Sequence, residues 1–321
     1  MTINKVMKFQ TTIPIKKSDF LIDYSSKLVS LGSCFAENMG EKFDYFKFST
    51  ITNPFGIIFN PISLEKILLR SIHKKYFTEK DVFFHNEAWH CFEVHSELSS
   101  PDKADFLATL NQLIDTTNWH IENATHCLIT LGTSWVYKHI ESDEIVANCH
   151  KVPQQQFVKE LLSVADIESS LKRIVSEIQV VNSNCKFIFT ISPVRHSKDG
   201  FIENNVSKSH LITALYQFLS KTTSSIYFPS YEIMMDELRD YRFYAEDMLH
   251  PNQTAIDYIW MKFSENFIDE IEFDTMQHIS EIQKSLRHRP FNPNSESHLK
   301  FQDNLKQKIN AIVAKYPEMK F

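Results

Sequence analysis

The chain has 321 residues, and 34 Lys and Arg against 40 Asp and Glu give it a formal net charge of −6. Hydrophobic residues make up 43% and charged residues 23%, which is typical of a folded globular protein and excludes a mainly disordered one. No long run of either charge is present, so nothing indicates a nucleic-acid-binding surface.

Four short apolar runs rich in β-branched and aromatic residues predict buried strands. Their apolar pattern is continuous, which is typical of central parallel strands covered on both faces. Apolar residues at helical spacing predict helices between these strands. The four runs are residues 27–31, 127–131, 186–191 and 225–228. One predicted helix follows Pro61, and three others lie over residues 106–114, 171–181 and 210–219. Alternating strands and helices predict one doubly wound α/β domain over residues 1–255.

The chain beyond Pro251 shows no further strand pattern. Its apolar spacing predicts helices over residues 255–271, 275–286 and 297–315. Because no strand set accompanies them, we expect residues 256–321 to form a helical extension packed on the α/β domain. The sequence leaves open whether this extension covers the site or forms a dimer, and the oligomeric state stays unknown.

Several classes of site and location are disfavoured by the sequence. The N-terminal residues contain no hydrophobic signal core, and no run of about 18 apolar residues predicts a membrane span. We therefore expect a cytoplasmic protein without membrane or nucleic-acid partners. Five scattered cysteines argue against a disulfide framework, and the histidine spacing does not favour a metal site. Phosphate-binding glycine motifs are absent, so no cofactor is expected.

The first strand runs directly into Gly32, Ser33 and Cys34, which precede helix-forming residues. Such a turn exposes a small nucleophilic side chain, and the start of a helix directs N–H groups and positive dipole toward it. A thiol there is expected to shift toward thiolate, its reactive form. The alternative is that Ser33 caps the helix and Cys34 is a small buried hydrophobe.

The second fragment with chemical potential is Asp247-Met248-Leu249-His250-Pro251. Asp and His three residues apart in a loop can turn toward one point, where His250 would act as a general base that Asp247 orients. The alternative is an aspartate that caps a helix beside a surface histidine.

These fragments resemble the SGNH (GDSL-type) hydrolase superfamily, and within it the GSCFA family, over roughly residues 25–260. The resemblance implies a flavodoxin-like three-layer α/β/α sandwich with a parallel sheet. It places Cys34 at the position of the nucleophilic serine, and Gly56 and Ser134 beside the Cys34 N–H in the oxyanion hole. Asp247 and His250 match the Asp-x-x-His block.

Two departures from the superfamily pattern bear on the chemistry. Ser134 replaces the usual asparagine, and the loss of one oxyanion-hole donor raises the activation barrier by about 3–4 kcal/mol. A register shifted by one residue would make Ser33 the nucleophile, but we place Cys34 first because the strand end sets the turn.

Other polar side chains follow predicted strand ends, where open α/β sheets bind ligands. Arg195 and His196 would hold an anionic group or supply oxyanion donors, and His95 and His150 are weaker candidates for substrate binding. An ordinary surface loop is the alternative for each.

The sequence therefore predicts a hydrolase or acyltransferase that acts on an ester or thioester. By analogy with the superfamily, the substrate is a small molecule or a glycan ester such as an O-acylated sugar. A binding module that has lost the chemistry, or a papain-like cysteine peptidase, is the alternative.

Overall fold

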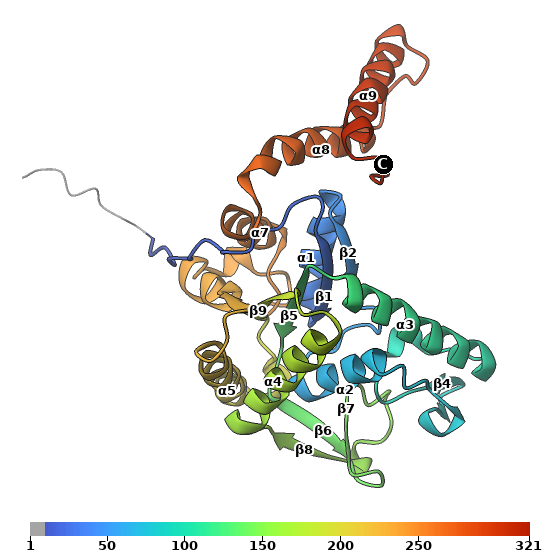
Figure 1. Cartoon of the computed structure of the whole chain (residues 1–321), viewed down its shortest axis with the longest axis vertical. Helices are drawn as coiled ribbons and strands as arrows, with labels where there is room; N and C mark the ends of the chain where they lie inside the picture. The colour runs from blue at the N-terminus through green and yellow to red at the C-terminus, as the bar shows by residue number, and fades with distance from the viewer. Residues whose placement is uncertain (1–9) are drawn as a thin grey trace, which may run out of the picture.

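The computed structural model describes residues 10–321 and has a five-stranded parallel sheet at its centre, in the order β10–β9–β5–β1–β2 (Figure 1). The strands are β1 (Lys27–Gly32), β2 (Ser49–Thr52), β5 (His126–Leu131), β9 (Lys186–Ile191) and β10 (Ser225–Phe228). Counted in chain order, this is the 2-1-3-4-5 arrangement of flavodoxin-like folds. The strand order reverses beside β1, so a ligand site is expected between the carboxyl ends of β1 and β5.

Helices cover both faces of this sheet and confirm the predicted three-layer α/β/α sandwich. Phe35, Phe43 and Phe263 pack on one face, together with Leu28 and Leu128 of the strands. The opposite face is covered by four helices whose buried apolar residues share one core cluster with the strands. The first layer is α1 (Cys34–Tyr45) and α7 (Gln253–Phe267), and the second is α2 (Pro61–Ile72), α3 (Lys103–Asn123), α4 (Val164–Val181) and α5 (Phe201–Leu219).

Two small antiparallel sheets were not predicted. A hairpin joins β3 (Phe83–His85) to β4 (Ala88–His90), and a three-stranded sheet has the order β7–β6–β8. The latter consists of β6 (Trp135–His139), β7 (Glu144–Val146) and β8 (Phe157–Leu161), inserted between β5 and α4. The strand β8 has exposed residues at every second position, β6 is mostly half-buried, and both are short, so no continuous apolar run marks them in the sequence.

The C-terminal helices α8 (Phe273–Leu286) and α9 (Glu296–Lys315) form a hairpin with its own small core around Ile279, Ile282 and Ile312. The boundary predicted at residue 255 falls inside α7, which packs on the sheet. Figure 1 shows the hairpin at the opposite end of the molecule from β6, β7 and β8.

Short helices complete the fold: η1 (Glu79–Asp81), η2 (Ser96–Leu98), η3 (Gln154–Gln156), η4 (Ser197–Asp199), α6 (Ser230–Glu232), η5 (Ile233–Glu237), η6 (Tyr241–Phe243) and η7 (Glu270–Glu272). Across residues 10–321, no helix combines the length and apolar character needed to cross a bilayer.

Candidate active site

The turn after β1 is fixed by the neighbouring strand β5. Gly32 has a φ of +135°, and a Cβ atom built on it would lie 2.1 Å from the carbonyl oxygen of Thr130. The next N–H, that of Ser33, donates to the same oxygen at 3.1 Å. Only glycine fits this close approach, and α1 therefore begins directly at the carboxyl edge of the sheet.

Ser33 is the N-cap of α1. Its hydroxyl oxygen accepts a hydrogen bond from the Phe35 N–H at 3.3 Å, and the residue is 1% exposed. The capping role proposed as the alternative is therefore the one that the structure shows for this side chain.

Cys34 is the first residue of α1 and is half-buried, so it is the more accessible of the two candidate nucleophiles. Burial raises the pKa of its thiol, the carboxylate of Glu37 raises it further, and the positive charge of Lys208 lowers it. The surroundings of Cys34 therefore oppose the predicted shift toward thiolate, because burial raises the pKa of the thiol by more than the Phe35 and Cys34 N–H groups at the helix start lower it. A base has to remove the thiol proton before this group can attack.

Asp247 and His250 form the predicted pair. Nδ1 of His250 lies 2.5 Å from Oδ2 of Asp247, while Oδ1 accepts the N–H groups of His250 and Leu249 at 3.0 and 2.9 Å. These backbone hydrogen bonds, foremost that of His250, lower the pKa of Asp247 to about 2. The helix that follows is capped by Asn252 instead, so Asp247 is free to orient the imidazole.

His196 follows β9 and carries a buried ring nitrogen. Its Nε2 atom has no hydrogen-bond partner in the described part of the chain, while its backbone N–H donates to Asn204 Oδ1 at 3.0 Å. Burial, and then the charges of Lys208 and His250, lower the pKa of His196 to about 3. The imidazole is therefore neutral at physiological pH.

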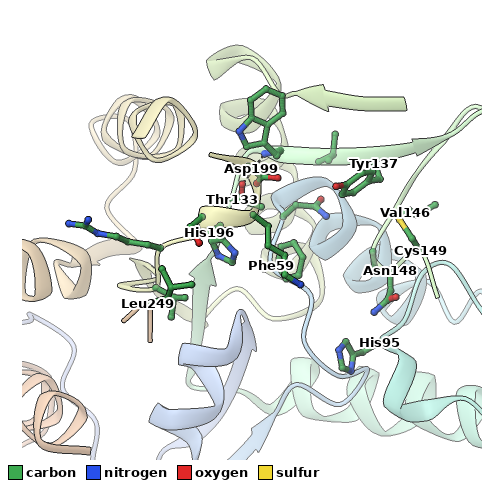
Figure 2. Close-up of a pocket in the computed structure, with 18 of the residues that line it drawn as sticks. Phe59, His95, Thr133, Tyr137, Val146, Asn148, Cys149, His196, Asp199 and Leu249 are labelled. Atoms are coloured by element: carbon green, nitrogen blue, oxygen red, sulfur yellow. Dashed lines mark hydrogen bonds between the residues drawn. The ribbon is translucent and has the colours of Figure 1, made fainter. Parts of the chain in front are cut away.

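A cavity of about 410 Å³ lies at this edge of the sheet. Figure 2 shows Phe59 and His196 next to each other on one side of it, with Asn148 and His95 across from them. Its apolar walls include Phe59, Trp135, Tyr137, Val146, Val194 and Leu249, and its polar groups include His95, Asn148, Arg195, His196 and His250.

The predicted residues divide into those that line this cavity and those that do not. His95, Arg195, His196 and His250 line it. The remaining predicted residues lie outside its wall: Ser33, Cys34, Gly56, Ser134, His150 and Asp247. No hydrogen bond joins the Cys34 thiol to His250, both of which lie in the described range. The positive charge of Lys208 lowers the pKa of both the Cys34 thiol and His196, and the charge of His250 also lowers the pKa of His196.

Two of the three predicted oxyanion donors already have internal partners. The Gly56 N–H donates to the carbonyl oxygen of Asn53 at 2.7 Å. The hydroxyl of Ser134 is fully buried and donates to the carbonyl oxygen of Ser207 at 3.0 Å. The Cys34 N–H lies in the first turn of α1, where helical N–H groups lack intrahelical acceptors.

The remaining predicted binding residues have different surroundings. Nε2 of His150 lies 2.7 Å from the carbonyl oxygen of Cys91, in a buried cluster of aromatic rings. The guanidinium of Arg195 contacts Met235 Sδ at 3.3 Å and lines a second, smaller cavity. His95 faces Glu97, with 3.6 Å between Nδ1 and Oε2.

Lys208 lies at this edge and was not among the predicted site residues. It lies on α5, is 2% exposed and donates from Nζ to the carbonyl oxygens of Gly132 and Ser192. Extending the helix predicted from His210 backward would have placed this lysine on the buried face, at helical spacing from Leu211 and Leu215.

Within residues 10–321, no group of three His, Cys, Asp or Glu side chains is arranged to hold a metal ion.

The sheet order and the edge that carries these groups define a flavodoxin-like α/β protein. The family model described as GSCFA family matches residues 27–263, and the chain belongs to the GSCFA family. A second model, described as GSCFA domain protein, C-terminal domain, matches residues 279–321 and thus covers α9 and most of α8. Comparison with curated proteins gives no match.

Proposed function

We propose that this GSCFA protein is an SGNH-type hydrolase or acyltransferase that acts on an ester or thioester through Cys34. The observation that carries the proposal is the oriented Asp247–His250 pair, whose imidazole lines a cavity at the same sheet edge as the start of α1. Cys34 is the nucleophile in this proposal because Ser33 is buried and already caps the helix.

The proposed reaction begins with proton transfer from the Cys34 thiol to Nε2 of His250. Because Asp247 holds Nδ1, Nε2 is the ring nitrogen left to accept the proton. The sulfur then bonds to the acyl carbon, and the carbonyl oxygen becomes an oxyanion. Its collapse expels the alcohol or thiol, which takes the proton back from Nε2 and leaves an acyl group on Cys34. Water completes hydrolysis, or a second hydroxyl group completes transfer.

Substrate is needed to bring the thiol and the imidazole together, since no hydrogen bond joins them in the described structure. Catalytic hydrogen bonds are often long before substrate binds. The proposed oxyanion donors are the Cys34 N–H and the neutral imidazole of His196, whose buried Nε2 lacks a partner among the described residues. Two preorganised donors of this kind contribute several kcal/mol, on the order of 3 for each.

The cavity wall favours a substrate with an apolar or ring-shaped part. Trp135 and Tyr137 of β6 and Phe59 offer aromatic surface, and Asn148 offers an amide. An acyl chain or a sugar ring fits this combination, so an O-acylated sugar is one of the substrates proposed.

Turnover of a substrate panel tests the proposal. The panel contains activated esters, acyl thioesters, acetylated sugars and a peptide, assayed with the full chain. We expect ester or thioester cleavage that disappears in Cys34→Ala and falls strongly in His250→Ala. Cys149→Ala is the matched control, because Cys149 also lines the cavity but has no role in the proposal. Cleavage that survives both Cys34→Ala and His250→Ala would refute it.

A binding module is the second candidate, and one observation favours it. Gly56 and Ser134, which stand at the oxyanion-donor positions of the superfamily pattern, are bound internally. This candidate predicts saturable binding of an acylated sugar with no turnover of any panel member. It also predicts that Cys34→Ala binds as tightly as the natural chain.

A further inference from the structure

A second, smaller cavity lies beside the one that His250 lines. Its volume is about 230 Å³, and Arg195 lines both cavities, so the two adjoin at this residue. Leu249 and His250 line the larger cavity, whereas Met248 lines the smaller one. The loop that carries the Asp247–His250 pair therefore contributes to the walls of both.

This loop is held closed by its own backbone. The Ala245 N–H donates to the carbonyl oxygen of His250 at 2.8 Å, and the Met248 N–H donates to that of Ala245 at 2.9 Å. Tyr244, which lines the smaller cavity, pairs with Pro251 across the base of the loop as an isolated β-bridge. A group bound against Tyr244 would thus lie beside the loop that presents His250.

Two arginines give the smaller cavity positive charge. Arg195 and Arg239 line it, and Asp240 is the carboxylate that the described residues contribute to its wall. Across residues 10–321 the arginines that form salt bridges are Arg70 and Arg173, and the sequence before residue 10 contains no Asp or Glu. Arg195 and Arg239 thus have no carboxylate partner, in a chain whose net charge is −6.

The guanidinium of Arg195 has unused hydrogen-bond donors. The residue is half-buried, its Nη2 contacts Met235 Sδ at 3.3 Å, and its side chain also meets the hydroxyl of Tyr244. A thioether is a weak acceptor and a guanidinium carries five N–H donors, so most of them remain available to a ligand. Partial burial of this charge is costly without an anionic partner. The nearby Asp240 instead caps η6, where its Oδ1 accepts the Arg242 N–H at 2.8 Å.

We propose that Arg195 and Arg239 bind an anionic group of the substrate in the smaller cavity. The group is a carboxylate, a sulfate or a phosphate, because a planar guanidinium matches the paired oxygens that these groups share. The hydroxyl groups of Tyr241 and Tyr244 offer further donors there. That the anion belongs to the substrate rests on the proposed function, in which His250 acts on an ester bound in the larger cavity.

The substrate is then an ester with two unlike parts. The larger cavity, with its apolar and aromatic wall, takes the uncharged part, and the anionic group passes Arg195 into the smaller cavity. Because the anion binds away from the reacting atoms, it contributes to substrate affinity and not to the chemical step. Loss of an arginine therefore raises KM more than it lowers kcat.

Anion binding is tested on the full chain by NMR of labelled arginine side chains. Inorganic phosphate, sulfate and acetate are added separately at constant ionic strength, since salt screens exposed charges. We expect at least one of these anions to shift the Arg195 and Arg239 signals saturably. Its affinity is expected to fall about tenfold in Arg195→Gln and in Arg239→Gln, because each variant loses a charged hydrogen-bond donor.

Arg173→Gln is the matched control. It removes the same charge from a pair with Glu65 that lines neither cavity, so the affinity is expected to stay unchanged. Arg239 is exposed, so Arg239→Gln decides the question even if Arg195→Gln does not fold. No saturable shift with any of the three anions, or equal affinity in folded Arg239→Gln, would overturn the proposal.

Paired esters test whether the anion belongs to the substrate. The two esters share one acyl group, and the alcohol part carries the anion that binds most tightly in one and a neutral group of similar size in the other. We expect the natural chain to prefer the anionic ester about tenfold in kcat/KM, and Arg239→Gln to lose this preference through KM. Equal cleavage of both esters would refute an anionic substrate and leave the hydrolase proposal standing. Cleavage of neither would refute the hydrolase proposal, whereas the anion site itself is decided by the NMR experiment without any substrate.

Discussion

The imidazole of His196 occupies the space beside Gly132 that a side chain at that position would enter. A Cβ atom built on Gly132 would lie 3.2 Å from His196 Nε2 and 2.6 Å from the Cβ of Phe59. The chain contains five glycines, and this one is required by the close approach of two residues that line the cavity.

Gly132→Ala is therefore expected to displace His196 and Phe59. If His196 supplies an oxyanion donor, turnover falls about tenfold or more, because a donor displaced by 1 Å loses much of its effect. The free energy of unfolding falls by about 1–3 kcal/mol, as is usual for overpacking. Steady-state kinetics and chemical denaturation check both. Unchanged turnover in a folded Gly132→Ala protein would argue against a role for His196.

Ser33→Ala separates the two candidate nucleophiles. Since Ser33 caps α1, its loss is expected to cost about 1 kcal/mol of unfolding free energy while turnover persists. Cys34→Ala should show the reverse, with turnover lost and stability nearly kept. Paired denaturation and activity measurements test this contrast. Loss of activity in Ser33→Ala alone would move the nucleophile one residue back.

Asp247→Asn tests the orientation of the imidazole. The amide cannot hold Nδ1–H of His250 as a carboxylate does, so a smaller fraction of the imidazole presents a basic Nε2. We expect kcat to fall about 100-fold or more, with KM little changed. Kinetics of this variant against Glu246→Gln, a neighbouring loop carboxylate, provide the comparison. Equal activities of the two variants would contradict the role of Asp247.

The buried histidines predict loss of stability in acid. Burial foremost lowers the pKa of His150 to about 4, while an unfolded histidine titrates near 6.5. The unfolded chain therefore binds the proton first, and stability is lost as the pH falls from 6.5 toward 4. His150→Gln, which cannot titrate, should reduce the drop in unfolding free energy between pH 7 and pH 5 by about 2 kcal/mol. Urea denaturation at both pH values measures it, and an unaltered drop would contradict the assignment.

Much of the fold was predictable from local patterns. The apolar runs at 127–131 and 186–191 lie within β5 and β9, because strands buried on both faces are continuously apolar. The short edge strand β2 escaped prediction, since its four residues are only partly buried or exposed. The antiparallel sheet of β6, β7 and β8 was not predicted either, because its short strands are also only partly buried. The aromatic residues Trp135 and Tyr137 of β6, which line the cavity, were therefore not predicted.

The site was predictable only where neighbours in sequence are neighbours in space. The Asp247–His250 pair comes from one turn, so a motif of four residues described it. The desolvation of Cys34 and the internal partner of Ser134 arise from tertiary contacts that no short motif contains. Gly56 instead bonds within its own turn, to Asn53 three residues earlier. Lys208 was missed because the helix was predicted only from His210, whereas α5 begins at Phe201. Its carbonyl acceptors, which follow β5 and β9, are tertiary contacts.

The most direct measurement is the identity of the residue that carries the acyl group. The full chain would be mixed with an activated acyl thioester, quenched in acid within milliseconds to seconds, and mapped by peptide mass spectrometry. We predict an acyl adduct on Cys34 that forms quickly in the natural sequence and much more slowly in His250→Ala. Turnover of the thioester with the acyl group on Ser33, or with no acyl-enzyme at any time point, would contradict it.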